Sequence, residues 1–193
     1  MKRQILLMAL CAAVSSASAQ ENVFGLTAGA ALTTTSADDA QLKVGGSIGA
    51  YYDVTLSDAW HLQPRLQFGY EEAESKGSAK TAAFFSQWNV TLPVLLSYRF
   101  ALSPSGGLRV NIGPYGQYAL FGRERQQFTD GSHLGWWHGG FSRRFSCGLQ
   151  VGAAFECTPR LQLLLDGRLS FKSSELSLDG KQRTLMLGLG YRL

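Results

Sequence analysis

The sequence lacks the features that mark several large protein classes. Only 5 of its 193 residues are Pro and only 17% are charged, whereas about a quarter of a typical globular domain is charged. A disordered chain combines high charge with few aromatic residues, but 11% of this chain is aromatic. Its 22 Gly residues do not recur at every third position, as collagen requires. After residue 20 no run of 18 apolar residues occurs, which excludes membrane-spanning helices.

The first residues have the pattern of a secretory signal. Lys2 and Arg3 give a positive start, Ile5–Val14 is apolar, and Ala17–Ala19 is a small-residue cleavage pattern before Gln20. The sequence therefore predicts two parts: a signal peptide over residues 1–19 and one mature domain over residues 20–193. Loss of the signal lowers the formal net charge from +4 to +2, which leaves no basic field for a nucleic-acid partner.

Few cysteines remain after the signal. Cys147 and Cys157 lie ten residues apart within one expected strand, so their Cα atoms would be about 33 Å apart. A disulfide needs less than about 7 Å. We therefore expect two free thiols, and we expect neither a metal site nor a cofactor.

Hydrophobic and polar residues alternate with a period of two in eight stretches, which is the pattern of β-strands. The stretches are Phe24–Leu32, Leu42–Leu56, Trp60–Tyr70, Trp88–Phe100, Leu108–Leu120, Phe145–Cys157, Leu161–Phe171 and Leu185–Leu193. Pro64, Pro93 and Pro114 fall inside them and predict bulges or positions near an interface, because Pro removes a ladder hydrogen bond.

The two faces of these strands differ sharply in charge. The apolar face carries no charged residue. The other face carries nine: Lys43, Asp53, Arg65, Arg99, Arg109, Glu156, Asp166, Arg168 and Arg192. A soluble sandwich or lipocalin also alternates, but its polar face meets water and carries many Lys and Glu. Here the polar face is rich in Gly, Gln, Ser and Tyr, which favours a crowded interior with lipid outside.

The connections alternate in length and set the expected topology. Ser57–Ala59, Ala101–Gly107 and Thr158–Arg160 are short, and the other connections are longer. Short periplasmic turns and long outer loops on an even number of strands are typical of outer-membrane barrels. We therefore predict an all-β, eight-stranded, antiparallel up-and-down transmembrane barrel with both termini periplasmic. Outward aromatic residues should then form two belts at the lipid boundaries.

Three segments also resemble a known family. Asn89–Phe100, Val110–Gly116 and Leu187–Leu193 are similar to the small outer-membrane β-barrel proteins of Bacteroidetes, the PorT-like or porin-family group. The resemblance spans the whole mature chain and implies an envelope protein of the Gram-negative outer membrane. It also implies that Pro is tolerated at Pro93 and Pro114, and it permits an accessory role in a protein-secretion system.

An eight-stranded barrel is just wide enough to be filled by side chains. The nine inward charges are therefore expected to form an ion network that plugs the lumen. The alternative is a narrow, porin-like passive channel, helped by inward glycines such as Gly25, Gly152 and Gly190. The same glycines would equally make room for long side chains opposite them.

The longest loop contains a cluster of aromatic residues among glycines. Trp136, Trp137, His138 and Phe141 are a candidate interaction site for a partner protein, a sugar or lipopolysaccharide, or they pack on the barrel rim. Arginines flank the cluster and would meet lipopolysaccharide phosphates or remain solvated: Arg123, Arg125, Arg143 and Arg144.

Catalysis has weak support in the sequence. The local nucleophile and base pairs are Ser132 with His133 and His138 with Ser142, all in one loop. We therefore expect a monomeric, non-enzymatic barrel with a structural role or a surface role through its outer loops. Its expected partners are outer-membrane lipid and lipopolysaccharide, with envelope or secretion proteins as further candidates.

Overall fold

The protein is described here from a computed structural model, which covers residues 22–35, 40–77, 81–103, 106–128, 131–136, 144–172 and 182–193. The predicted signal peptide lies outside these residues. Among these residues, no helix is both long and apolar enough to cross a membrane.

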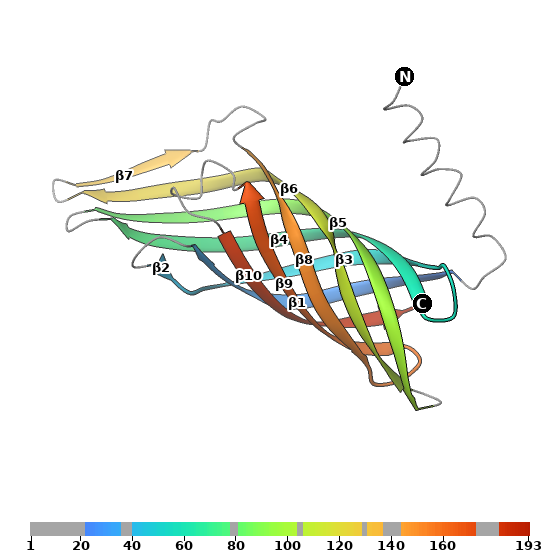
Figure 1. Cartoon of the computed structure of the whole chain (residues 1–193). Coiled ribbons are helices and arrows are strands. Elements are labelled where there is room, and N and C mark those ends of the chain that lie inside the picture. The colour runs from blue at the N-terminus through green and yellow to red at the C-terminus, as the bar shows by residue number, and fades with distance from the viewer. Residues whose placement is uncertain are drawn as a thin grey trace, which may run out of the picture.

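The chain folds into one closed antiparallel barrel (Figure 1). The barrel strands are β1 (Val23–Thr35), β3 (Lys43–Thr55), β4 (Trp60–Gly77), β5 (Thr81–Ser103), β6 (Gly106–Phe128), β8 (Phe145–Glu156), β9 (Leu161–Lys172) and β10 (Gln182–Arg192). Neighbours in the chain pair with each other, β1 pairs with β10, and the β4–β5 pairing completes the ring. The eight predicted strands and their closure into a barrel are confirmed.

The register fixes the tilt of the strands. A path that follows register partners once around the barrel starts at Thr55 on β3 and returns to β3 at Gly45. The two positions are ten residues apart. This shear tilts the strands against the barrel axis and sets the width of the lumen. It also brings side chains from distant parts of the sequence to the same level.

Alternation along each strand separates a polar inside from an apolar outside. On β9, for example, Leu163 and Leu165 are 42% and 48% exposed, whereas Asp166 and Arg168 are 3% and 4% exposed. The prediction that the apolar face points outward is confirmed. Unpaired backbone groups are costly in lipid, so a strand there needs both edges paired, and the closed ring supplies that pairing.

Aromatic side chains mark two levels on the outer wall. Near the tight turns, Trp60 and Tyr98 have ring centroids 4.9 Å apart. Ten residues further along β4, Tyr70 and Trp88 have centroids 5.0 Å apart, and Phe121 packs against Trp88 at 6.1 Å. Aromatic rings at both levels are typical of the two membrane interfaces.

The strands β4, β5 and β6 continue past the upper aromatic level. β5 and β6 have 23 residues each, against 12 for β8 and for β9, and a spanning strand needs about 9–11 residues. Two short strands join this extension, β2 (Ala40–Gln41) beside β4 and β7 (Gly131–Trp136) beside β6. The prediction that residues 71–87 and 121–144 are loops was therefore wrong over much of both segments. Figure 1 shows the extension at the end opposite the C-terminus.

The three prolines do not produce the predicted bulges. The β4–β5 register is unchanged across Pro64, although the ladder is interrupted between Pro64 and Gln67. The β5–β6 register is likewise unchanged across Pro93 and resumes at Leu96. Each proline lies near the middle of the span, so the ladder loses pairs there without any slip of the strands.

Candidate functional site in the barrel lumen

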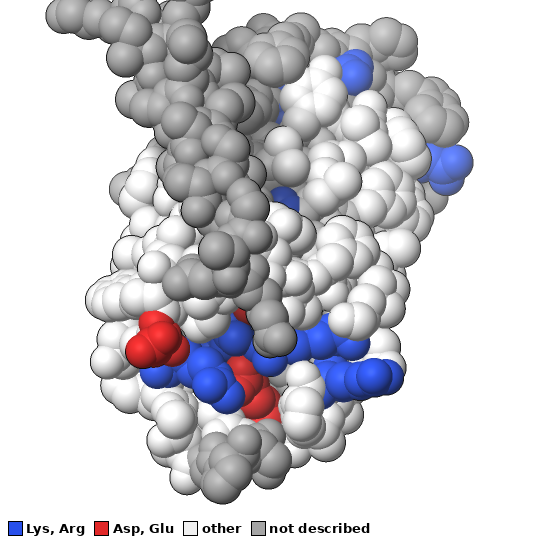
Figure 2. Space-filling view, turned by 90° about the vertical axis from the view of Figure 1, so that its right-hand side faces the viewer, with Lys and Arg blue, Asp and Glu red and all other residues white. Residues whose placement is uncertain are grey.

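Nearly all of the charged side chains on the membrane-spanning strands point into the lumen. All nine residues of the predicted charge network lie on the inward side of their strands, and Lys43 is opposite the fully buried Thr33. The other eight form contacts that separate into three groups along the barrel axis. Figure 2, which looks at the end of the barrel where β10 ends, shows basic side chains with acidic ones between them.

The first group lies at the end with the tight turns and centres on Glu156. Arg99 Nε donates to Glu156 Oε2 at 2.9 Å, and Arg109 Nε donates to Oε1 at 2.8 Å. Arg192 Nη2 donates to the same Oε1 at 2.7 Å. Arg109 also pairs with Asp53. Three guanidinium groups thus share two carboxylates.

A single ion pair occupies the middle of the lumen. Arg65 Nη1 donates to Asp166 Oδ2 at 2.7 Å, although the two residues are 101 positions apart in the sequence. Arg65 Nε donates to Gln63 Oε1 at 2.8 Å. Both members of the pair are at most 4% exposed.

The third group centres on Glu71, which the sequence alone predicts to lie in a loop. Glu71 Oε2 accepts hydrogen bonds from Gln182 Nε2 at 2.9 Å and from Gln117 Nε2 at 3.0 Å. Its Oε1 lies 3.5 Å from Arg168 Nη1. Residues 71–77 show no alternation of apolar and polar residues, so the sequence holds no signal that would have placed this carboxylate inside the barrel.

Amides and aromatic rings fill the space between the charges. Arg168 also donates to Gln150 Oε1 at 3.1 Å, and its guanidinium carbon lies 5.7 Å from the centre of the Tyr115 ring. Gln162 Nε2 donates to the Tyr51 hydroxyl at 2.9 Å. A Cβ on Gly25 would lie 2.2 Å from Tyr51 Cζ, so this inward glycine makes room for the ring.

The lumen also holds an Asp–His–Ser set that the sequence analysis did not identify. Asp53 Oδ1 lies 3.3 Å from His61 Nδ1, and Ser97 is the register partner of His61 across β4 and β5. Ser97 is 0% exposed, and neither its Oγ nor His61 Nε2 has a hydrogen-bond partner. The set lacks the nucleophile–base hydrogen bond and the access to substrate that catalysis needs.

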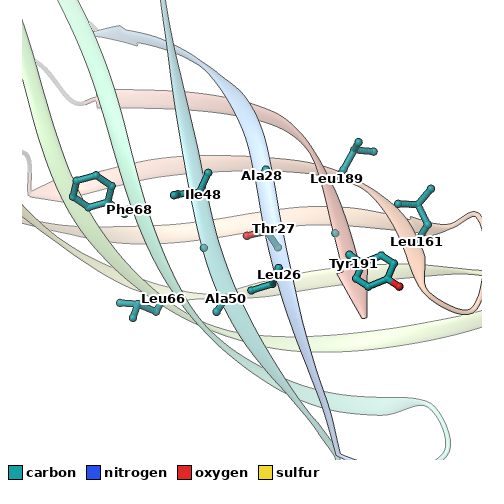
Figure 3. Close-up of a pocket in the computed structure, with 12 residues that line it drawn as sticks. Leu26, Thr27, Ala28, Ile48, Ala50, Leu66, Phe68, Leu161, Leu189 and Tyr191 are labelled. Atoms are coloured by element: carbon teal, nitrogen blue, oxygen red, sulfur yellow. The ribbon is translucent and has the colours of Figure 1, made fainter. Parts of the chain in front are cut away.

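The outer wall carries an apolar groove instead of a polar site. The groove has a volume of about 710 Å³ and crosses β1, β3 and β4 beside the end of β10 (Figure 3). Ala28 and Ala50 form its low floor, and Leu26, Ile48 and Leu66 rise beside them. A surface of this kind accepts hydrocarbon and offers almost no hydrogen bonds.

A family model described as the outer membrane protein beta-barrel domain matches residues 5–192. The chain belongs to this family. Members of the outer membrane protein beta-barrel domain family lie in the outer membrane, which agrees with the apolar outer wall and the polar lumen. No individually curated protein sequence matches the chain.

Several solved structures share the fold of this family member. The outer membrane enzyme PagL is 12% identical with a TM-score of 0.51, covering 90% of this chain and all of its own. Ail of Yersinia pestis, in complex with sucrose octasulfate, is 16% identical with a TM-score of 0.50 over the same shares. OprG of Pseudomonas aeruginosa is 13% identical with a TM-score of 0.48, over 90% of this chain and 97% of its own. Identities this low show a common fold alone.

The predicted loop site lies mostly beyond what the structure describes. Trp136 ends β7, whereas Trp137, His138 and Phe141 lie outside the described residues. The candidate pair Ser132 and His133 lies on β7, beside the backbone of Gln127 and Gln126. The other candidate pair, His138 with Ser142, is also outside the described residues. Both remaining cysteines are free, as expected: Cys147 is half-buried and Cys157 is exposed.

Proposed function

We propose that this outer-membrane barrel is a closed, non-enzymatic and monomeric scaffold that presents its extended β-sheet at the cell surface. The observation that carries the proposal is the filled lumen. Arg65, Arg109 and Arg168 are 3–4% exposed, and each is held by a carboxylate on another strand. Ions have no open path past these groups unless a buried pair breaks, which costs about 3–5 kcal/mol.

The surface role is supported by the strands that outgrow the membrane. β4, β5 and β6 continue about seven residues beyond the upper aromatic level, which at about 3.3 Å per residue is roughly 23 Å along the strand. Lipid contact does not need this extension. It carries the described residues 71–77, 81–87, 121–128 and 131–136 beyond the upper aromatic level, where an external partner can reach them.

Lipid is the partner that the outer wall favours. The groove over Ala28 and Ala50 is lined almost wholly by apolar side chains. At the level of the upper aromatic residues, Arg123 is exposed and is a candidate for the phosphates of lipopolysaccharide. Arg144 is half-buried and donates to the Leu120 carbonyl at 3.3 Å. The start of β1 and the end of β10 lie at the end with the short turns, and we infer that this end faces the periplasm.

Planar-bilayer recordings test the closed lumen. The wild-type protein should give no stable openings. Glu71→Ala and Arg168→Ala each remove one side of the upper plug and should produce openings or noise, whereas Asp58→Asn in an exposed turn should not. Stable openings of the wild type whose size changes with Arg109→Ala or Arg168→Ala would overturn the proposal and favour the narrow passive channel.

A role in protein secretion is the remaining alternative, and it rests on the resemblance to PorT-like barrels. The segments Asn89–Phe100 and Leu187–Leu193 carry that resemblance, and they lie within β5 and at the end of β10. Co-purification with secretion components from intact envelopes would support this role. Isolation as a lone barrel under the same conditions would favour the scaffold.

A further inference from the structure

Five inward residues follow one another as register partners across five neighbouring strands. They are His61 on β4, Ser97 on β5, Asn111 on β6, Gly152 on β8 and Asp166 on β9. Directly opposite residues in an antiparallel sheet have Cβ atoms about 4.5–5.5 Å apart. The five therefore form one continuous row along the inner wall, which we call the polar row.

The polar row contains an unusual concentration of buried polar atoms without partners. They are His61 Nε2, Ser97 Oγ, Asn111 Oδ1, Asn111 Nδ2 and Asp166 Oδ1. The four residues that carry them are between 0% and 7% exposed. Buried polar groups are almost always hydrogen-bonded, to protein or to ordered water. No described protein atom forms a hydrogen bond with these five atoms, so we expect another hydrogen-bonding species beside them.

Space for a small species is found at the Asp166 end of the row. Gly152 has no side chain, and Asp166 Oδ1 lies 2.0 Å from the place that a Cβ on Gly152 would take. The carboxylate thus occupies the space that Gly152 leaves on β8, beside its register partner Asn111. On its other side, Asp166 borders a cavity of about 20 Å³ that Gln67 and Ser47 also line, which is room for about one water molecule.

We propose that the polar row binds a chain of internal water molecules that joins His61 to Asp166. Each orphaned atom can take part, because the Asn111 amide donates and accepts, Ser97 Oγ does both, and Asp166 Oδ1 accepts. Asp53 Oδ1 lies 3.3 Å from His61 Nδ1, so Nε2 is the ring nitrogen that remains for the row. A cation is disfavoured, since Arg65 and Arg109 already neutralise the carboxylates nearby.

The water chain ends inside the barrel. On one side it meets the Arg65–Asp166 pair, and beyond that pair the Glu71 group closes the lumen with hydrogen-bonded amides. The inference therefore goes beyond the closed scaffold. The lumen is wet along one half of its wall and still impermeable to ions.

Magnetisation transfer from water to protein, measured by NMR on the full barrel in nanodiscs, tests the proposal. The Asn111 side-chain amide should show direct transfer from long-lived water. The Gln162 amide is the matched control, because it is buried and already bonded to the Tyr51 hydroxyl, and it should show none. Absence of transfer at Asn111 in the wild type would overturn the proposal, and this result needs no variant to fold.

Two further measurements separate water from the alternatives. Ser97→Ala should reduce the transfer at Asn111 while conductance stays at the wild-type level, so this test stands apart from that of the closed lumen. A fluorophosphonate probe should leave Ser97 unlabelled in the folded protein. Labelling of Ser97 would contradict an enclosed water chain, since it requires both an entry path and an activated nucleophile.

Discussion

At the scale of single residues, Glu156 illustrates how one carboxylate holds several strands together. It lies on β8 and accepts hydrogen bonds from Arg99 on β5, Arg109 on β6 and Arg192 on β10. The side chain is 4% exposed, so water cannot replace it. Arginines this close repel one another when the carboxylate is lost.

We expect Glu156→Gln to lower the free energy of unfolding by about 3–5 kcal/mol, because it leaves buried guanidinium groups without their shared counter-charge. Urea unfolding of the barrel in lipid vesicles measures this loss. Asp58→Asn is the control, since Asp58 is an exposed acid in the turn between β3 and β4, and it should leave the midpoint unchanged. Equal midpoints for both variants would contradict the role given to Glu156.

Gly25 shows the same dependence on space inside the lumen. A Cβ there would lie 2.2 Å from Tyr51 Cζ, whereas the nearest atom to a Cβ on Gly167 is 3.8 Å away. Gly25→Ala should therefore destabilise the barrel by about 1–3 kcal/mol through overpacking, and Gly167→Ala should be close to neutral. Combining Gly25→Ala with Tyr51→Leu should recover part of the loss, as a double-mutant cycle would measure.

At the scale of strands, the sequence predicts the segments that cross the membrane but not the parts of the strands that extend beyond it. The eight spanning strands were found because lipid on one side and a packed lumen on the other impose a period of two. Above Tyr70 the outer face meets water, so Glu71 and its neighbours carry no such alternation. This is why the upper parts of β4, β5 and β6 were predicted to be loops.

The partners across the lumen could not be predicted in the same way. Arg65 and Asp166 were both placed inside the barrel, but their pairing depends on the shear, which is set by the register of all eight strands. Glu71 was not predicted to lie inside the barrel, because the part of β4 that carries it was predicted to be a loop. His61 and Ser97 were not linked because the β4–β5 register, which places them opposite each other, depends on where the long hairpin turns.

The direction of the strands in the membrane can be tested with a native side chain. Cys157 is exposed beside the tight turn that follows β8, on the side inferred to be periplasmic. A membrane-impermeant maleimide should not label it on intact cells, in a Cys147→Ser background, and should label it after the outer membrane is permeabilised.

The complementary position lies on the extension of the sheet. Lys76→Cys, near the end of β4, should be labelled on intact cells when both native cysteines are replaced by Ser. Labelling of Cys157 but not of position 76 on intact cells would reverse the orientation and place the extended sheet in the periplasm.

At the scale of the whole molecule, the barrel inverts the arrangement of a soluble protein. Its large exposed hydrophobic side chains are Leu, Ile, Val, Phe, Tyr and Trp, and its buried polar set includes Arg65, Arg109 and Arg168. Such an exposed apolar surface is stable only against hydrocarbon. The proposals of a closed lumen and of an internal water chain both depend on this orientation of the two faces.

The depth dependence of an introduced charge tests that orientation most directly. Leu165 lies outward near the middle of β9, and Leu161 lies outward at its turn end. In lipid vesicles, Leu165→Arg should lower the free energy of unfolding by about 2–4 kcal/mol and Leu161→Arg by about 0–1 kcal/mol. Losses that are equal and near zero at both positions would mean that water, not hydrocarbon, contacts this wall, and would contradict the account.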